Sequence, residues 1–183
     1  MKRSLRLLLS AVLSLGLAGA AFGSSASDNG RLDQRLNKEV RHALVMIPQF
    51  GVFDNLSYRV DGSTVTLYGQ VRDAIVKDVA QSSVKRLEGV ERVDNRIEVL
   101  PASFNDDRIR AQVARAVFGD PRLSSYASQP VPPIHIVVKN GHVDLVGMVR
   151  TQADKDSAFI RANGVPGVFK VNNNLQVEQP AKG

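Results

Sequence analysis

Few residues of this chain have the types and spacing that catalysis or metal binding requires. The sequence contains three histidines, His42, His135 and His142, and no cysteine. His142 and Asp144 point to the same face of an expected strand, and His135 precedes a neighbouring strand, so two of these side chains could share a metal. Structural zinc usually needs four ligands, however. We therefore predict that the chain has no metal site.

Other kinds of catalytic machinery are not indicated either. No serine has a histidine and an acid in a suitable context, and the spacing suggests no pair of catalytic carboxylates. No glycine-rich loop is placed to bind phosphates. We therefore predict that the chain has no catalytic residues, needs no cofactor and is not an enzyme.

Arginines beside apolar residues form the first candidate binding site. They belong to an expected helix that starts near Asn105 and to the segment after it. The candidate lipid-binding residues are Arg108, Arg110, Arg115, Phe118, Arg122, Leu123 and Tyr126. Such cations can meet phosphate headgroups while apolar side chains enter the lipid boundary. The pattern predicts peripheral binding to an anionic phospholipid or membrane surface, and the alternative is a solvated helix face with Phe118 in the core.

Apolar residues on an outer sheet face form the second candidate site. Val137, Val146 and Met148 occupy strand positions that should point away from the core. The first half of the chain has Tyr68 and Gln70 where Val146 and Met148 stand. This asymmetry predicts a surface for an envelope protein or an unfolded client protein.

An internal repeat sets the domain organisation. Residues 60–99 and 138–177 align without a gap, so both copies carry the same Val-x-Leu-x-Gly-x-Val pattern. A residue type kept in both copies serves the shared fold, whereas a residue present in one copy is a better candidate for function. The expected segments are two domains, 31–100 and 104–178, with disordered tails at 24–30 and 179–183.

Each copy predicts the order helix, strand, strand, helix, strand. In the first copy, apolar residues at spacings of three and four predict helices over about 32–47 and 73–87. Alternating apolar residues predict strands over 56–60, 64–71 and 93–99. Each helix and the sheet have one apolar face, so both helices should cover the same side. The fold class is therefore α+β, with two tandem α-β-β-α-β modules, each a three-stranded sheet with two helices packed on one face.

Two residue types at inward strand positions occur in both copies. Gly69 and Gly147 are interpreted as sites where a helix packs closely on the sheet. Asn95 and Asn173 are interpreted as buried amides that bond to nearby backbone at the start of the third strand. Because both copies share these residues, we interpret them as structural.

Residues 1–23 have the tripartite pattern of a secretory signal peptide, with a cationic start, an apolar run over 7–20 and small residues before the expected cleavage after Gly23. Cleavage after Ala20 and an uncleaved anchor helix are the alternatives. The formal net charge of +6 falls to +3 when the three cationic residues of this leader are removed. A mild positive charge suits weak attraction to anionic surfaces and does not indicate nucleic acid as a partner.

The repeated pattern resembles the BON domain, a small module of bacterial envelope proteins. The matching motifs are Val-x-Leu-x-Gly-x-Val at 65–71 and 143–149, Gly-Val at 89–90 and 167–168, and Val-x-Asn-x-(Ile or Leu)-x-Val at 93–99 and 171–177. The resemblance implies a periplasmic protein and phospholipid binding, with the second domain as the lipid reader. The chain differs from lipid-anchored members because it has no cysteine to lipidate.

These observations predict an exported, non-lipidated periplasmic protein that binds anionic phospholipid surfaces weakly and reversibly, in envelope maintenance or stress. The alternative is a periplasmic chaperone or an adaptor that binds unfolded or envelope proteins.

Overall fold

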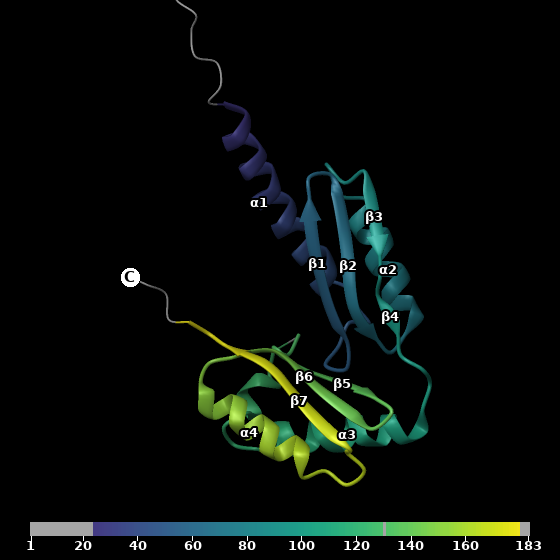
Figure 1. Cartoon of the computed structure of the whole chain (residues 1–183), viewed down its shortest axis with the longest axis vertical. Helices are drawn as coiled ribbons and strands as arrows, with labels where there is room; N and C mark the ends of the chain where they lie inside the picture. The colour runs from purple at the N-terminus through teal and green to yellow at the C-terminus, as the bar shows by residue number, and fades with distance from the viewer. Residues whose placement is uncertain (1–23, 130, 180–183) are drawn as a thin grey trace, which may run out of the picture.

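The computed structural model describes residues 24–129 and 131–179 and contains two α+β domains (Figure 1). The expected signal peptide lies outside the described residues. The first domain consists of α1 (Ser24–Val45), β1 (Asn55–Asp61), β2 (Thr64–Val71), α2 (Ala74–Lys85), β3 (Arg92–Asn95) and β4 (Glu98–Val99). The second consists of α3 (Phe104–Phe118), the short 3-10 helix η1 (Ser124–Tyr126), β5 (Ile134–Lys139), β6 (His142–Val149), α4 (Gln152–Asn163) and β7 (Lys170–Val177).

The two sheets have the same topology. In the first, β2 lies in the middle and pairs antiparallel with β1 and parallel with β3 and β4. In the second, β6 pairs antiparallel with β5 and parallel with β7. The third strand expected over 93–99 is present but interrupted, since β3 and β4 are separate elements that both pair with β2.

Both helices of each domain cover the same face of the sheet, as predicted. In the first domain the buried core side chains come from both helices and from the sheet, α1, α2 and β2 among them. Of the inward residues predicted for the first helix, Leu36, Val40 and Leu44 of α1 and Ile47 just after it are buried, whereas Ala43 is half-buried. The order and the one-sided packing confirm the predicted fold class.

The first helix is longer than the sequence indicates. Residues 24–30 were expected to be a disordered tail, but α1 already begins at Ser24. Adding a residue to an existing helix forms one hydrogen bond per residue fixed, whereas starting a helix is costly. The apolar face that begins at Leu36 holds the rest of α1 on the sheet, so the helix can extend backward through polar residues.

The two inward asparagines bond to the covering helix. The Asn95 side chain donates to the carbonyl oxygen of Lys77 on α2 at 3.1 Å and accepts the N–H of Ile97 at 3.2 Å. Asn173 repeats this geometry with the carbonyl oxygen of Lys155 at 2.9 Å. Each amide therefore accepts a nearby N–H of its own strand, as expected, and also ties that strand to the helix above it, which supports a structural role.

Gly69 and Gly147 are structural, but their physical reason differs from the expected helix packing. Both have positive φ, +119° and +122°, in the middle strands β2 and β6. A Cβ would collide with the carbonyl oxygen of Asn55 or Pro133, where the neighbouring strand approaches. The constraint therefore comes from the adjacent strand and from the backbone conformation.

Replacing Gly69 or Gly147 with alanine should lower the free energy of unfolding by at least about 2 kcal/mol, because strain and a backbone collision act together. Chemical denaturation measures this value. Gly164→Ala is the matched control, since its nearest neighbouring atom lies 3.6 Å away and its φ is −80°. Equal stability of the Gly69 and Gly164 variants would contradict the explanation.

The loop between α1 and β1 connects the two domains. It approaches β5 of the second domain (Figure 1), where the N–H of Ile136 donates to the carbonyl oxygen of Val52 at 2.8 Å. Val52 and Phe53 also pack against the core of the second domain. Two exposed ion pairs, Arg72–Asp107 and Glu98–Lys139, join the domains beside this loop.

His135 lies in the middle of this contact. Its ring stacks on Phe50 with centroids 5.3 Å apart, and its Nδ1–H donates to the carbonyl oxygen of Gly51 at 3.2 Å. Burial lowers the pKa of His135 below its ordinary value, although hydrogen bonds to the backbone of Gly51 and Asp54 and the charge of Asp54 oppose the shift. The neutral ring is therefore the form that the domain contact favours.

Acidification should weaken the folded protein through His135. Because the pKa is lower in the folded state, the unfolded chain binds the proton first as the pH falls below about 6.5. The stability contribution is thus complete above this pH and declines below it. Thermal unfolding between neutral pH and about pH 5 should show this loss, and His135→Phe, which keeps the stacking, should reduce it. An unchanged pH dependence in His135→Phe would contradict this role.

Candidate membrane-binding surface

The structure removes one predicted lipid-binding arginine from the surface. Arg110 is 3% exposed and faces the sheet. Its guanidinium donates to the carbonyl oxygen of Val138 on β5 at 2.6 Å and to Asp107 at 2.7 Å. The prediction that Arg110 contacts lipid is therefore wrong. Its place in the helix is inward, one residue after buried Ile109, and its charge satisfies a strand carbonyl at the sheet edge.

The prediction that Leu123 and Tyr126 contact lipid is also wrong. Both belong to the core of the second domain, with exposures of 0% and 3%. The Tyr126 hydroxyl donates to Asp154 at 2.9 Å and accepts the N–H of Arg150 at 2.8 Å. The segment after α3 therefore folds back as η1 and closes the second domain. It does not extend an apolar surface into solvent.

Among the remaining predicted residues, the arginines lie on the surface. Arg108, Arg115 and Arg122 are exposed, whereas Phe118 is half-buried and packs against the core. Phe118 thus follows the alternative interpretation, a core contact at the helix end. The exposed arginines need apolar neighbours other than those predicted if this face is to bind lipid.

Such neighbours come from residues that the sequence analysis missed. Phe104 at the start of α3 is 89% exposed, Ile160 on α4 is 67% exposed, and Phe169 before β7 is 79% exposed. Phe104 and Arg108 are one turn apart on α3, so they share a helix face. We call Phe104, Arg108, Arg115, Ile160, Arg161 and Phe169 the α3–α4 surface.

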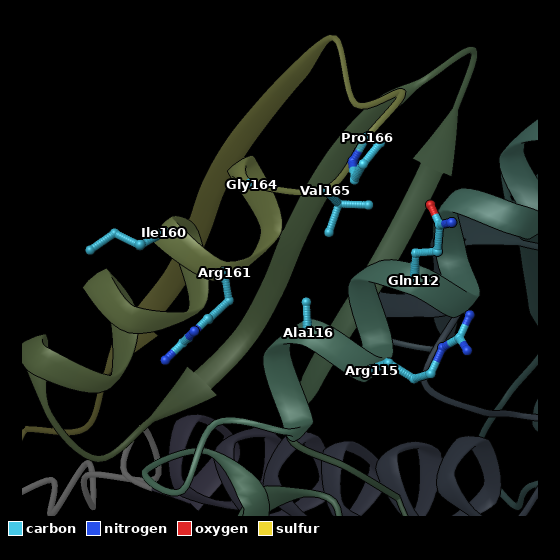
Figure 2. A pocket seen from close by; sticks show the side chains of 8 residues that line it. All are labelled: Gln112, Arg115, Ala116, Ile160, Arg161, Gly164, Val165 and Pro166. Atoms are coloured by element: carbon cyan, nitrogen blue, oxygen red, sulfur yellow. The ribbon is translucent and has the colours of Figure 1, made fainter.

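Two observations relate the arginines of this set to neighbouring residues in space. Arg115, Ile160 and Arg161 line a shallow cavity of about 490 Å³ between α3 and α4 (Figure 2). The guanidinium of Arg108 lies beside Gly167, in the loop that leads to Phe169. The surface therefore combines three guanidinium groups with large apolar side chains, and Asp156, one turn before Ile160, partly opposes its charge.

Arg161 is held in place by a carboxylate. Its Nε donates to Asp120 at 2.8 Å, and Asp120 also accepts the backbone N–H of Arg122 at 2.9 Å. The Arg122 N–H and then the Arg161 guanidinium keep the pKa of Asp120 below its ordinary value. Asp120 thus stays charged and orients Arg161 beside the cavity.

The repeat gives the signal that would have identified this surface. At the equivalent positions the first domain has Ser82 for Ile160, Ser83 for Arg161 and Glu91 for Phe169. These exchanges are specific to the second copy and replace polar or acidic residues with apolar or cationic ones. A comparison of the second helices of the two copies, beside that of the first helices and the outer sheet faces, reveals these differences.

The second predicted site is divided by the structure. Met148 is 47% exposed and Val146 is half-buried on the outer face of β6. Val137, expected on the same exposed face, is 2% exposed, so its assignment as an open partner-binding residue is wrong. Val137 belongs to β5, where the α1–β1 loop of the first domain packs. The residue pattern of one repeat does not predict such a contact between domains.

The histidines do not come together. In the β5–β6 hairpin His135 is opposite Val146, whereas His142 is opposite Lys139, so the two rings lie at opposite ends. Among the described residues, no three His, Asp or Glu side chains are grouped in a way that could hold a metal ion. No helix in the described part of the chain is both long and apolar enough to cross a membrane.

The fold and this pair of domains define the protein class. The BON domain matches residues 32–101 and 105–179, so the chain belongs to the BON domain family. It is 30% identical over 173 residues to the outer membrane lipoprotein DolP of Haemophilus influenzae, covering 89% of this chain and 84% of the relative. It is also 30% identical over 165 residues to the osmotically-inducible protein Y of Escherichia coli, covering 88% and 81%.

The chain also matches a solved structure, the C-terminal domain of CdsD from the type III secretion system of Chlamydia trachomatis. The match covers 79% of this chain and 98% of the CdsD chain. The two are 13% identical with a TM-score of 0.28. A TM-score of 0.28 is too low to support an argument from this structure.

Tyr126→Phe should destabilise the second domain without changing membrane binding. Losing the hydroxyl leaves Asp154 and the Arg150 N–H without their partner, which costs about 1–3 kcal/mol. Thermal unfolding and vesicle co-sedimentation measure the two effects separately. Tyr58→Phe is the control, because its hydroxyl makes one exposed bond to the carbonyl oxygen of Asn37. Weaker vesicle binding by a folded Tyr126→Phe protein would restore Tyr126 to the lipid site.

Proposed function

We propose that the protein binds anionic phospholipid surfaces peripherally and reversibly through the α3–α4 surface. The observation that carries this proposal is that Arg115 and Arg161 line one cavity with exposed Ile160, in a domain that also exposes Phe104 and Phe169. Guanidinium groups pair with phosphate, and large apolar side chains enter the boundary between headgroups and acyl chains. A solvated helix face has no need for three large apolar side chains.

The magnitudes fit weak and reversible attachment. Each arginine near an anionic membrane contributes on the order of 1 kcal/mol, and this attraction is reduced by salt. Three arginines and a few partly inserted side chains do not replace a lipid anchor or a spanning helix. Binding should therefore depend strongly on anionic lipid and on ionic strength.

An envelope role agrees with the family and with the leader pattern. One relative is named an outer membrane lipoprotein, and the other an osmotically inducible protein. Residues 1–23 carry the pattern of a cleaved export signal. Together these support the proposal of an exported periplasmic protein in envelope maintenance or stress.

The proposal is tested with vesicles of phosphatidylglycerol and phosphatidylcholine, and of phosphatidylcholine alone. Changing Arg108 and Arg115 to glutamine should weaken co-sedimentation with the anionic vesicles by about thirtyfold, from roughly 2 kcal/mol of lost attraction. The matched control changes Lys38 and Arg59, exposed cations of the first domain, to glutamine. Equal binding by the two variants would contradict the proposed surface.

A second pair of substitutions tests the apolar part. Ile160→Ser and Phe169→Glu install the residues that the first domain carries at the equivalent positions. Together they should reduce vesicle binding and leave the melting temperature nearly unchanged, because both side chains are exposed. Full binding at high salt by this variant would show that apolar insertion is not involved.

A further inference from the structure

A groove of about 630 Å³ lies between the two domains, separate from the α3–α4 surface. The first domain contributes the end of α1 and the strand β1. The second domain contributes residues 131–133 and the outer faces of β6 and β7. Half-buried Val146 and exposed Met148 lie on the β6 side of this groove.

The groove follows a strand edge. Four consecutive residues of β1, Asn55 to Tyr58, line it. Successive side chains of a strand point to opposite faces, so four in a row line a groove only when it runs along the edge of the strand. Within the described residues β1 pairs on one side alone, with β2. Its other edge therefore offers backbone donors and acceptors beside the groove.

The lining selects among possible occupants. Val45, Leu56, Val146 and Met148 supply apolar area, whereas the side-chain amides of Asn55, Gln129, Asn174 and Gln176 supply hydrogen-bond donors and acceptors. An acyl chain would cover these amides without bonding to them, which is unfavourable. A polypeptide offers both apolar side chains and amide groups that can pair with them.

The charge of the residues that line the groove further limits which class of ligand can bind. Arg41 is present, and no Asp or Glu is among the residues that line the described groove. One cation is too few for the phosphate contacts of a nucleic acid. It suits a segment that is neutral or weakly acidic.

We propose that this groove binds an extended, neutral or weakly acidic segment of another protein, which adds to the free edge of β1. In such binding the main-chain hydrogen bonds supply affinity and alternate side chains enter pockets. The apolar side chains of the segment would pack on Val146 and Met148. This function is independent of the proposed membrane binding, since it uses the opposite face of the second domain's sheet.

The test uses a fluorescent synthetic peptide of alternating valine and threonine residues with an aspartate at each end. Fluorescence anisotropy should show saturable binding to the full protein without lipid. The same peptide with prolines in place of alternate threonines should not bind, because it lacks the N–H groups needed to extend a strand. Failure of the first peptide to bind, or equal binding of both, would overturn the proposal.

Substitutions locate the binding. Val146→Asp together with Met148→Asp should weaken peptide binding at least tenfold and leave vesicle binding unchanged. The matched control is Met46→Asp together with Ile75→Asp, exposed apolar residues that do not line the groove. If both pairs bind the peptide equally well, the groove is not the site. The vesicle measurement separates this outcome from a failure of the membrane proposal.

Hydrogen exchange provides a measurement that does not depend on substitutions. Adding the valine–threonine peptide should slow amide exchange in β1, residues 55–61, because a new strand pairs with its free edge. The edge strand β7 serves as the internal comparison. Protection on β7 without protection on β1 would assign the peptide to a different edge and overturn the proposal.

Discussion

Each domain covers one face of its sheet with two helices, and this one-sided packing determines what the other faces can do. With three strands and two helices, a single apolar layer lies between the helices and the sheet. The outer face must then be polar or be covered by something else. In the first domain it carries threonine, tyrosine and glutamine on β2. In the second it carries Val137, Val146 and Met148 among polar residues such as Asp144 and Asn172, and the first domain covers one part of it, at Val137.

The two copies use the segment after their first helix in different ways. In the second domain this segment is longer and places Leu123 and Tyr126 in its own core. In the first domain the shorter segment places Val52 and Phe53 against the neighbouring core. The backbone bond between Val52 and Ile136 and the stacking of Phe50 on His135 belong to the same contact. The shorter segment after α1 thus forms the contact between the domains, whereas the longer segment after α3 completes the core of its own domain.

The repeat and the hydrophobic periods were sufficient to predict the element order, the one-sided helices and most core residues, because these depend on local pattern. The binding residues were harder to predict. Arg110 is buried because a β5 carbonyl and Asp107 receive its charge, and Tyr126 is buried because Asp154 and Arg150 satisfy its hydroxyl. Asp107 is one helical turn from Arg110, but the Val138 carbonyl lies 28 residues away, and Asp154 and Arg150 lie 28 and 24 residues from Tyr126. Exposed Ile160 and Phe169 could have been found by comparing the second helices of the two copies, whereas the burial of Val137 requires knowledge of the domain contact.

The loop that joins the domains also affects the order in which the protein can be completed. The first domain is synthesised before β5 exists, so Val52 and Phe53 have no surface to pack against until the second domain has folded. During that interval the nascent protein presents two apolar side chains and an unpaired carbonyl at one end. Folding of the second domain therefore covers an apolar surface of the first. A truncated chain that ends after β4 would leave Val52 and Phe53 exposed and prone to associate with other apolar surfaces.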